Sequence, residues 1–426
     1  MSAPVAYPRT NEDWNVLSYE ASQIFSPSAP VDEADLFAGR QTQLNKLIET
    51  VLEKGKHAIL YGERGVGKTS LAKVFRLLFP AIVKKVILLR EQADRDDTFT
   101  SIWRKVFKDI EVQIRENGVE TKVALADFYE KEITPDDVRR ELERSFSLNE
   151  IPVIIIDEFD RTSPETRKAT ASMVKDLSDY TVNATVIIVG VADDIGEILD
   201  EHESLRRCIE QIHMPRMSND EMKEVINKRL PRLGMKIDRD SLWKIVVLSR
   251  GLPSYVHLLG MCAVQAAIDN RRLNITESDV DSAVHRAIEK SRESVQKEYA
   301  AAIHTNREDT LFKEVLLACA LARTDDRGLF SPNAVIGPLT SILGRDVKIA
   351  NFQNHLKKFI GAERGKILIR KGKERAYKFR FRDPMMQPYI IMRGVEGKMV
   401  DATSLDVLSS PEQPELPNVR PQPSSQ

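Results

Sequence analysis

The segment that most constrains this chain is residues 62–70, which read GERGVGKTS. It matches the spacing GxxxxGK[ST], with two glycines ahead of Lys68 and Thr69. An apolar run, HAILY at 57–61, precedes it and a helical pattern follows it, which is the strand–loop–helix context that the spacing requires. A chance glycine-rich turn would not need that context. The segment therefore predicts a loop whose backbone N–H groups bind phosphates at the start of a helix.

The chemistry of a bound nucleotide assigns roles to the groups of this loop. Lys68 is expected to neutralise the β- and γ-phosphates of ATP, which gives it a catalytic role, and the Thr69 hydroxyl is expected to complete the shell of a magnesium ion. The glycines allow the backbone to turn tightly around the phosphates. The predicted ATP-binding residues of the loop are Gly62, Glu63, Arg64, Gly65, Val66, Gly67, Lys68, Thr69 and Ser70.

A second motif, VIIIDEFD at 153–160, is an apolar run that ends in carboxylates. A strand buried on both faces would bring Asp157 to the carboxyl edge of the sheet, where open α/β sheets bind ligands. Asp157 is expected to hold magnesium through water, and Glu158 to orient or deprotonate the attacking water as the catalytic base. A solvated acidic turn is the alternative. Asp160 is either an accessory of this site or the N-terminal cap of a helix that begins near Ser163.

Short β-branched runs alternate with longer helical patterns in the first half of the chain, which predicts an α/β fold with a parallel sheet covered by helices. Residues 217–306 carry helical patterns only, which predicts a helical lid, and residues 98–110 predict an amphipathic helix. Five runs are expected to form the strands: 57–61, 83–89, 152–157, 184–191 and 211–214. Pairs spaced as N-cap and N3 mark three helix starts: Thr134 with Asp137, Ser218 with Glu221, and Thr276 with Asp279.

Composition narrows the class of protein but not its partners. Charged residues make up 30% of the chain and hydrophobic residues 42%, with a formal net charge of -1, which is typical of a globular protein in water. Cys208, Cys262 and Cys319 lack the spacing of a zinc site and are expected to be reduced, ordinary residues. No stretch approaches the roughly 20 apolar residues of a membrane span, and the first residues do not resemble a signal peptide. The expected location is cytoplasmic, with no membrane contact.

The two motifs resemble those of the AAA+ ATPases, and within them the origin-recognition initiators and the related prokaryotic STAND-type ATPases. The resemblance covers residues 34–395. It implies a P-loop NTPase core, ATP hydrolysis that depends on magnesium, and self-association or a protein partner. LFAGR at 36–40 is similar to the family motif ahead of the P-loop, which implies that Phe37 and Gly39 lie against the adenine.

Three other positions follow from the same resemblance. Residues 202–218 resemble the stretch that carries the arginine finger, which implies that Arg206 or Arg207 reaches a neighbouring subunit's γ-phosphate, while a solvated arginine pair is the alternative. The GLP sequence that ends at Pro253 resembles the STAND motif near the adenine, where initiators carry an arginine. Asp193 stands where the family usually places an Asn, Ser or Thr that senses the γ-phosphate, and a helix-capping role is the alternative.

The last third of the chain changes character. From about residue 309, three short helical patterns precede two alternating runs, which predicts a winged helix-turn-helix domain. Residues 345–382 contain 13 Lys or Arg and 3 Asp or Glu, an excess that suits a polyanion such as double-stranded DNA. A solvated wing in a protein-interaction module is the alternative. The third helix would offer Asn351, Gln353 and Asn354 to the major groove. The predicted DNA contacts are Lys357, Lys358, Arg370, Lys371, Lys373 and Arg375.

These observations predict a DNA-binding AAA+ ATPase that assembles or remodels a nucleoprotein complex. The alternative is a STAND-type ATP/ADP switch that acts on a protein partner, for instance in defence. A ring motor that threads protein is disfavoured because no aromatic pore-loop motif is evident, although Trp103 and Phe107 are available. The predicted domains are 1–33, a partly disordered arm; 34–215, the ATPase core; 216–306, the lid; 307–396, the winged helix; and 397–426, a disordered tail.

Overall fold

The chain forms two compact units. The computed structural model describes residues 8–27, 34–82, 86–116, 119–146, 150–191, 205–304, 310–325, 327–372 and 376–401. The first unit comprises Met1–Met235 with Gly251–Leu258, and the second comprises Lys236–Arg250 with Leu259–Gln426. The division falls inside the predicted lid, and the predicted domain boundaries stay a prediction.

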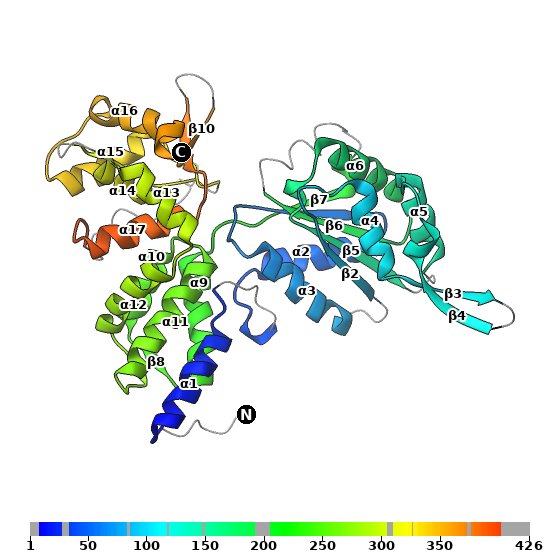
Figure 1. Ribbon diagram of the computed structural model, residues 1–426, viewed down its shortest axis with the longest axis horizontal. Helices are drawn as coiled ribbons and strands as arrows, with labels where there is room; N and C mark the ends of the chain where they lie inside the picture. The colour runs from blue at the N-terminus through cyan, green and yellow to red at the C-terminus, as the bar shows by residue number, and fades with distance from the viewer. Residues whose placement is uncertain are drawn as a thin grey trace, which may run out of the picture. The chain divides into compact units, whose positions relative to one another are not determined.

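A five-stranded parallel sheet forms the centre of the first unit, as the alternating pattern predicts (Figure 1). Its strand order is β2-β5-β6-β1-β7, so that β6 separates the strand of the glycine-rich loop from the strand that ends in Asp157. The three central strands, β1, β5 and β6, are buried along nearly their whole length. The bounds are β1 His57–Tyr61, β2 Val86–Gln92, β5 Ile151–Asp157, β6 Thr185–Gly190 and β7 Ile209–His213.

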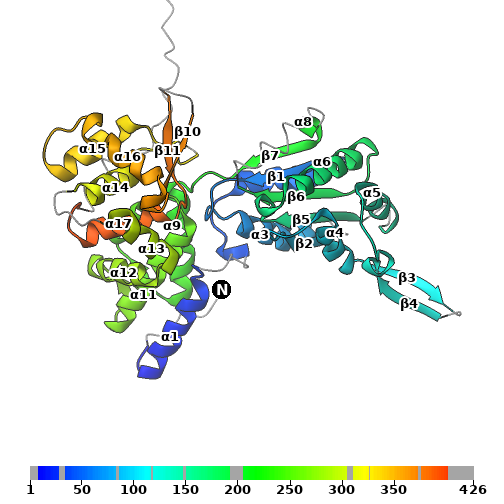
Figure 2. The same ribbon diagram turned by 45° about the horizontal axis from the view of Figure 1, so that its top comes forward.

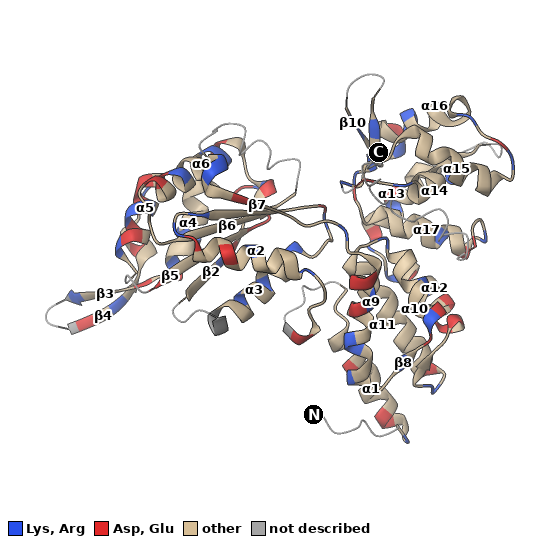
Figure 3. Ribbon diagram, turned by 180° about the vertical axis from the view of Figure 1, so that it is seen from behind, with Lys and Arg blue, Asp and Glu red and all other residues tan. Residues whose placement is uncertain are grey.

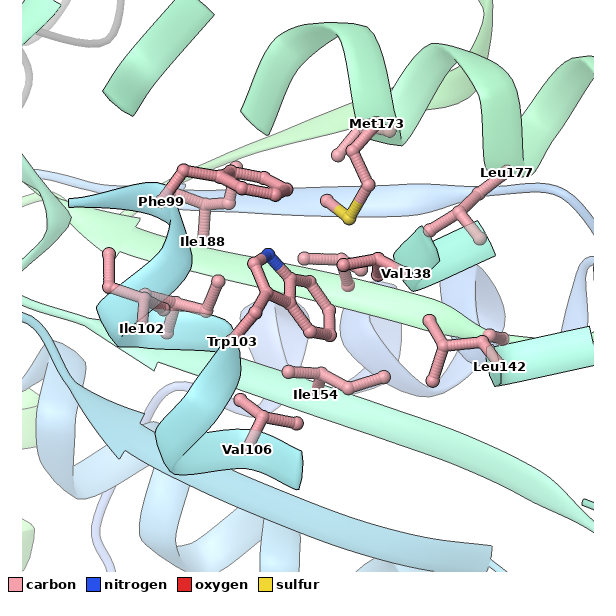
Figure 4. Close-up of a cluster of buried hydrophobic side chains, with 14 of the residues drawn as sticks. Phe99, Ile102, Trp103, Val106, Val138, Leu142, Ile154, Met173, Leu177 and Ile188 are labelled. Carbon is pink, nitrogen blue, oxygen red and sulfur yellow. The ribbon is translucent and has the colours of Figure 1, made fainter. Parts of the chain in front are cut away.

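Helices cover both faces of this sheet. On one face lie α4, α5 and α6, and on the other lie α2 and α3 (Figure 1). The centre of the first face is Trp103, which is fully buried among apolar side chains of α5, α6 and the sheet (Figure 4). Phe107 is equally buried, so neither aromatic of the predicted amphipathic helix is available as a pore-loop residue. The bounds are α2 Gln41–Leu52, α3 Lys68–Ile82, α4 Phe99–Lys108, α5 Pro135–Arg144 and α6 Pro164–Asp179.

An antiparallel hairpin between α4 and α5 was not predicted from the sequence. It consists of β3 Glu111–Glu116 and β4 Val119–Ala124, and it extends away from the five-stranded sheet (Figures 1 and 2). Val112 pairs with Val123 and Ile114 with Thr121, so one face is moderately apolar and the other is charged. The alternation is short and interrupted by charges, which explains why it gives a weak strand signal.

Local capping signals in the sequence are confirmed by the structure. The Asp137 and Glu221 N–H groups donate to the Thr134 and Ser218 hydroxyls, each at 3.2 Å, at the starts of α5 and of α9, Asn219–Arg229. Within the predicted N-terminal arm, Asn11–Ile24 forms helix α1. Its Trp14 and Leu17 are buried because they share one helical face, and Val16 is exposed.

The second unit is largely helical. It contains most of α11 Pro253–Asp269, together with α10 Arg239–Ser249, α12 Glu277–Lys290 and α13 Glu293–Ile303. The absence of strands that was expected over 217–306 is wrong in one detail, because β8 Lys236–Ile237 pairs in parallel with β9 Asn274–Ile275. The Asp279 carboxylate accepts the Thr276 N–H at 2.9 Å and so caps α12 as the sequence predicts.

The remaining elements follow the expected order of three helices and a hairpin. These are α14 Phe312–Leu321, α15 Pro332–Leu343, α16 Ile349–Ile360, β10 Leu368–Lys371 and β11 Lys378–Phe381. The strands are shorter than the alternating runs suggested, and Gly372 begins the turn with a φ of 98°. Phe330, between α14 and α15, exchanges two backbone hydrogen bonds of 2.8 Å with Phe379 of β11. Helix α17, Met386–Glu396, packs against α14.

Candidate functional site

The glycine-rich loop runs directly from β1 into α3. Gly65 and Gly67 adopt φ values of 86° and 97°, a left-handed conformation that disfavours side chains, so glycine is required at both positions. Gly62 lies so close to Met214 that a Cβ there would collide with the Met214 carbonyl oxygen. The 15-residue helix α3 begins at Lys68, so its N-terminus faces the space that the loop encloses. This geometry suits a phosphate group.

Lys68 links the loop to the acidic end of β5. Its ammonium donates to the carbonyl oxygens of Gly62 and Glu63 at 3.0 and 2.8 Å. Burial lowers the pKa of Lys68 to about 8, and the negative charges of Asp160 and Asp157 act in the opposite direction. The lysine of the first motif and the carboxylates of the second therefore lie within electrostatic reach of one another.

Asp157 is the last residue of β5 and is almost completely buried. Its Oδ1 accepts the N–H of Glu158 at 2.9 Å, and its Oδ2 accepts a hydrogen bond from the Arg90 guanidinium at 2.7 Å. Arg90 lies on the neighbouring edge strand β2. A buried carboxylate requires such partners because an unpaired charge is strongly disfavoured away from water.

Glu158 has a strained backbone and a constrained side chain. Its φ of 56° is uncommon for a residue that is not glycine. Its Oε2 accepts a hydrogen bond from Gln92, at 2.8 Å, and forms an ion pair with Arg161, at 2.7 Å. Backbone strain of this kind is often found at functional sites.

Asp160 is not the cap of the next helix. The hydroxyl of Ser163 caps α6 by accepting the Thr166 N–H, so the capping alternative is wrong. Asp160 instead accepts the N–H of Val191 at 3.1 Å, and a Cβ on Gly190 would lie 3.1 Å from its Oδ1. Asp160 therefore ties the turn after β5 to the end of β6, next to the site.

A buried ion pair connects the loop to the segment after β7. Arg216 donates from Nε to the Glu63 carboxylate at 2.6 Å, and both side chains are largely buried. The Met217 N–H donates to the carbonyl oxygen of Gly251, the first residue of the GLP sequence, at 2.9 Å. Pro253 lies against the loop, because a Cβ on Gly67 would be 3.8 Å from the proline Cγ. The GLP sequence is thus next to the phosphate-binding loop. Its place near the adenine stays a prediction.

The LFAGR segment is held by side chains of α9. The Gly39 N–H donates to Glu224 and the Arg40 N–H donates to Glu221, each at 3.0 Å, and Lys228 donates to the Phe37 carbonyl oxygen at 2.6 Å. Arg40 is buried and donates to the carbonyl oxygens of Val66 in the loop and Pro215 after β7, at 3.1 and 2.6 Å. This arginine joins three parts of the site.

Other predicted residues are placed differently or not described. Arg206 and Arg207 are exposed on α8, the four-residue helix Leu205–Cys208 ahead of β7. Asp193, Lys373 and Arg375 lie outside the described residues. The arginine-finger role, which concerns a neighbouring subunit, stays a prediction.

The oxygen groups of the site fit a magnesium ion that is shared with a nucleotide. Thr69 and Asp157 offer a hydroxyl and a carboxylate, which are the ligand types that magnesium prefers. Within the described ranges, no three His, Cys, Asp or Glu side chains form a group that could hold a metal. Magnesium in nucleotide sites usually binds through one or two carboxylates together with phosphate oxygens and water. Also within the described part of the chain, no helix is long and apolar enough to cross a membrane.

Comparison with known proteins gives the same class of molecule. The model of the family Novel STAND NTPase 1 matches residues 28–328, well over half of the 426 residues, and the chain belongs to this family. It is thus a STAND-type NTPase, which agrees with the P-loop that its sequence predicts. No curated protein sequence matches the chain.

Three solved structures are similar to this chain. The Walker-type ATPase paby2304 of Pyrococcus abyssi is 14% identical, with a TM-score of 0.52 over 87% of this chain and 99% of that one. Cdc6p of Pyrobaculum aerophilum is 14% identical, with a TM-score of 0.46 over 89% and 99% of the two chains. ORC1 of Aeropyrum pernix, solved in complex with DNA, is 14% identical, with a TM-score of 0.46 over 87% and 95%. The first likeness shows a shared fold only.

Four residues of the site were missed in the sequence. Arg90 and Gln92 contact the two carboxylates, and Arg40 and Arg216 hold the loop. The only signal in the sequence was that Arg90 and Gln92 are polar residues, spaced by two, at the end of an apolar strand. Arg40 and Arg216 carry no such signal, because their partners are far away in sequence.

Proposed function

We propose that this protein binds ATP with magnesium and hydrolyses it at the site between the glycine-rich loop and the end of β5. The observation that carries the proposal is the environment of Lys68, which donates to two carbonyl oxygens of the loop and interacts electrostatically with Asp160 and Asp157. Thr69 and Asp157 would hold the magnesium ion, which supplies positive charge to stabilise the transferred phosphate.

The residues of the chain have separate tasks in this proposal. Lys68 exchanges its two carbonyl acceptors for phosphate oxygens, and the N–H groups at the start of α3 face the same phosphates. Glu158 orients the attacking water and accepts its proton. Its contacts with Gln92 and Arg161 hold its carboxylate away from that task, so these contacts must change before turnover.

A direct test measures nucleotide binding and phosphate release by the purified protein. Wild type should bind a fluorescent ATP analogue and release phosphate slowly in the presence of magnesium. Lys68→Ala should lose most of the binding, because a charge that faces the phosphates is removed. Wild type that binds no nucleotide at any magnesium concentration would refute the proposal.

The C-terminal elements support DNA as the target of this ATPase. The order α14, Phe330, α15, α16, β10 and β11, with the extra strand pairing at Phe330, agrees with a winged helix-turn-helix. Helix α16 buries Phe352, Leu356 and Phe359. Its opposite side and the hairpin expose polar and basic residues: Asn351, Gln353, Asn354, Lys357, Lys358, Arg370 and Lys371. Figure 3 colours the lysines and arginines of the described elements blue.

This surface suits a helix that enters the major groove while the hairpin contacts phosphates. The test is fluorescence anisotropy with labelled duplex DNA at two salt concentrations, with ATP, with ADP and without nucleotide. Binding that weakens with salt and strengthens with ATP is the expected result. Absence of binding in every state would remove DNA from the proposed function.

A second candidate function is a STAND-type switch that acts on a protein partner. The observation that favours it is the GLP sequence beside the loop, where Pro253 faces Gly67 and the Arg216–Glu63 ion pair joins the same region. A difference in loop conformation between the ATP-bound and ADP-bound states would act directly on the GLP sequence, because Pro253 lies against the loop. Protein that is purified with bound ADP and shows no affinity for DNA would favour the switch.

A further inference from the structure

Two polar side chains on β2 face the two carboxylates at the end of β5. Arg90 pairs in register with Ile155, and Gln92 with Asp157, on adjacent parallel strands. Successive side chains of a strand alternate between its faces, so Arg90 and Gln92 point the same way. Gln92 contacts Glu158 and Arg90 contacts Asp157. The residue expected to act on water and the residue expected to hold magnesium therefore have different partners.

The contact of Arg90 with Asp157 is close and shielded from water. The donor and acceptor atoms are 2.7 Å apart, and the side chains of Arg90 and Asp157 are 21% and 4% exposed. The Nε of Arg90 is buried without an acceptor, so the position is not optimal for the arginine itself. An unsatisfied buried N–H is uncommon in folded proteins and calls for an explanation.

A divalent cation and a guanidinium can each neutralise the negative charge of Asp157. Each carboxylate oxygen has two lone pairs, so Oδ2 can accept Arg90 and still face a metal-bound water. A metal ion held by Asp157 would nevertheless be repelled by Arg90, because both would carry positive charge beside one buried carboxylate. A fixed arginine therefore stabilises the carboxylate when no metal is present and weakens its attraction for a metal.

We propose that Arg90 is the built-in counter-cation of Asp157 and sets the magnesium concentration at which the nucleotide site loads. Arg90 is a positioning residue, since it acts through Asp157. The inference rests on the proposed binding of nucleotide with magnesium. It adds that the positive charge of Arg90 weakens the binding of magnesium, so that the site stays empty of metal at the lowest magnesium concentrations.

The experiment titrates manganese, as a spectroscopic substitute for magnesium, into protein with ADP and follows free manganese by electron paramagnetic resonance. Arg90→Gln and Arg90→Met should lower the midpoint by about five-fold, because a nearby like charge is removed. Arg90→Lys, which keeps the charge, should stay within about two-fold of wild type. Arg139→Gln is the matched control, because Arg139 forms ion pairs with Asp136 and Glu143 on α5.

Thermal unfolding separates this role from a purely structural one. Without metal, the neutral variants should unfold at lower temperature than wild type, since Asp157 loses its partner. Manganese with ADP should then raise the unfolding temperature of these variants more than that of wild type. A variant that folds only when manganese and ADP are both present would support the proposal in the same way. Equal destabilisation in both conditions with an unchanged midpoint, or failure to fold in both, would overturn the proposal. Wild type that binds no nucleotide would instead refute the proposed function on which it rests.

Discussion

The charged residues of the first unit and those of α16 and the hairpin are used in opposite ways. Around the glycine-rich loop, Lys68, Asp157, Arg40 and the Glu63–Arg216 pair are largely buried and each has a defined partner. On α16 and β10, the cations Lys357, Lys358, Arg370 and Lys371 lie on the surface. The buried charges fix the geometry of the site, whereas the exposed cations place positive charge on the surface.

This difference predicts how each region responds to change. A buried charge interacts strongly with few partners, so a single substitution leaves another charge unpaired and has a large effect. An exposed charge is screened by salt and acts as one of many, so its effect is small and additive. Substitutions at the buried site should therefore have larger effects than substitutions on the exposed surface of α16 and β10.

The largest effect is expected at Glu158. Glu158→Gln should keep nucleotide bound but reduce turnover by about 10² to 10⁴-fold, because the general base is removed. Phosphate release under saturating ATP is the measurement. Glu165→Gln is the matched control, since Glu165 is an exposed carboxylate at the start of α6. Turnover that persists in Glu158→Gln would take this residue out of the catalytic role.

The next effect concerns the buried Glu63–Arg216 ion pair. Glu63→Gln or Arg216→Met alone should lower the free energy of unfolding by about 2 to 4 kcal/mol, because each leaves a buried charge unpaired. The double variant should lose less than the sum of the two. Denaturant unfolding of the nucleotide-free protein gives these values.

An exposed ion pair provides the comparison. The Glu293 carboxylate and the Lys297 ammonium are 2.6 Å apart on α13, and both side chains are mostly exposed. The coupling energy between them should be below about 0.5 kcal/mol. Equal coupling energies for the buried and the exposed pair would remove the contrast between the two regions.

A smaller effect is expected on the surface of the second unit. The double change Lys357→Glu and Lys371→Glu should weaken DNA binding about ten-fold at low salt, and it should reduce the salt slope by about one for each phosphate that the protein no longer neutralises. The control with the same net charge is Lys236→Glu with Lys297→Glu, two exposed lysines on other elements. Equally weakened binding in both double variants would mean that binding follows net charge and not this surface.

The smallest effect is a pH dependence of nucleotide binding. The pKa of Lys68 is lowered to about 8 by burial, so the free protein loses this proton as pH rises through that value. Phosphates favour the charged lysine, so affinity should fall roughly three-fold from pH 7.5 to 8.5. Nucleotide titrations at both pH values measure this change. Lys68→Arg, which keeps its charge, should show no such fall, and a flat profile in wild type would contradict the prediction.

The same lowered pKa has a consequence for stability in the absence of nucleotide. Between about pH 8 and the ordinary lysine value, the unfolded chain binds more protons at this position than the folded one. The contribution of Lys68 to stability therefore rises with pH across that window. A lysine that gains a carboxylate partner on folding shows the opposite dependence, because its pKa is raised and its contribution to stability falls as pH rises.

Much of the first unit could be predicted because its signals are local. The loop spacing, the five strands, the helix with Trp103 and the caps at Thr134 and Ser218 all depend on residues close together in sequence. A glycine spacing limits backbone conformation, and the period of apolar residues distinguishes strands from helices. The hairpin β3–β4 was missed because its alternation is short and interrupted by charges.

The sequence by itself determined that a phosphate-binding loop and a pair of strand-end carboxylates exist on a parallel sheet. Only the tertiary structure decided which side chains and carbonyl groups contact the loop and these carboxylates. Arg90 meets Asp157 because β2 pairs with β5 in one register, and a shift of one residue would turn its side chain to the other face. Arg40 reaches Val66 and Pro215 because three distant segments meet. Partners of this kind depend on strand register and packing, which no local pattern encodes.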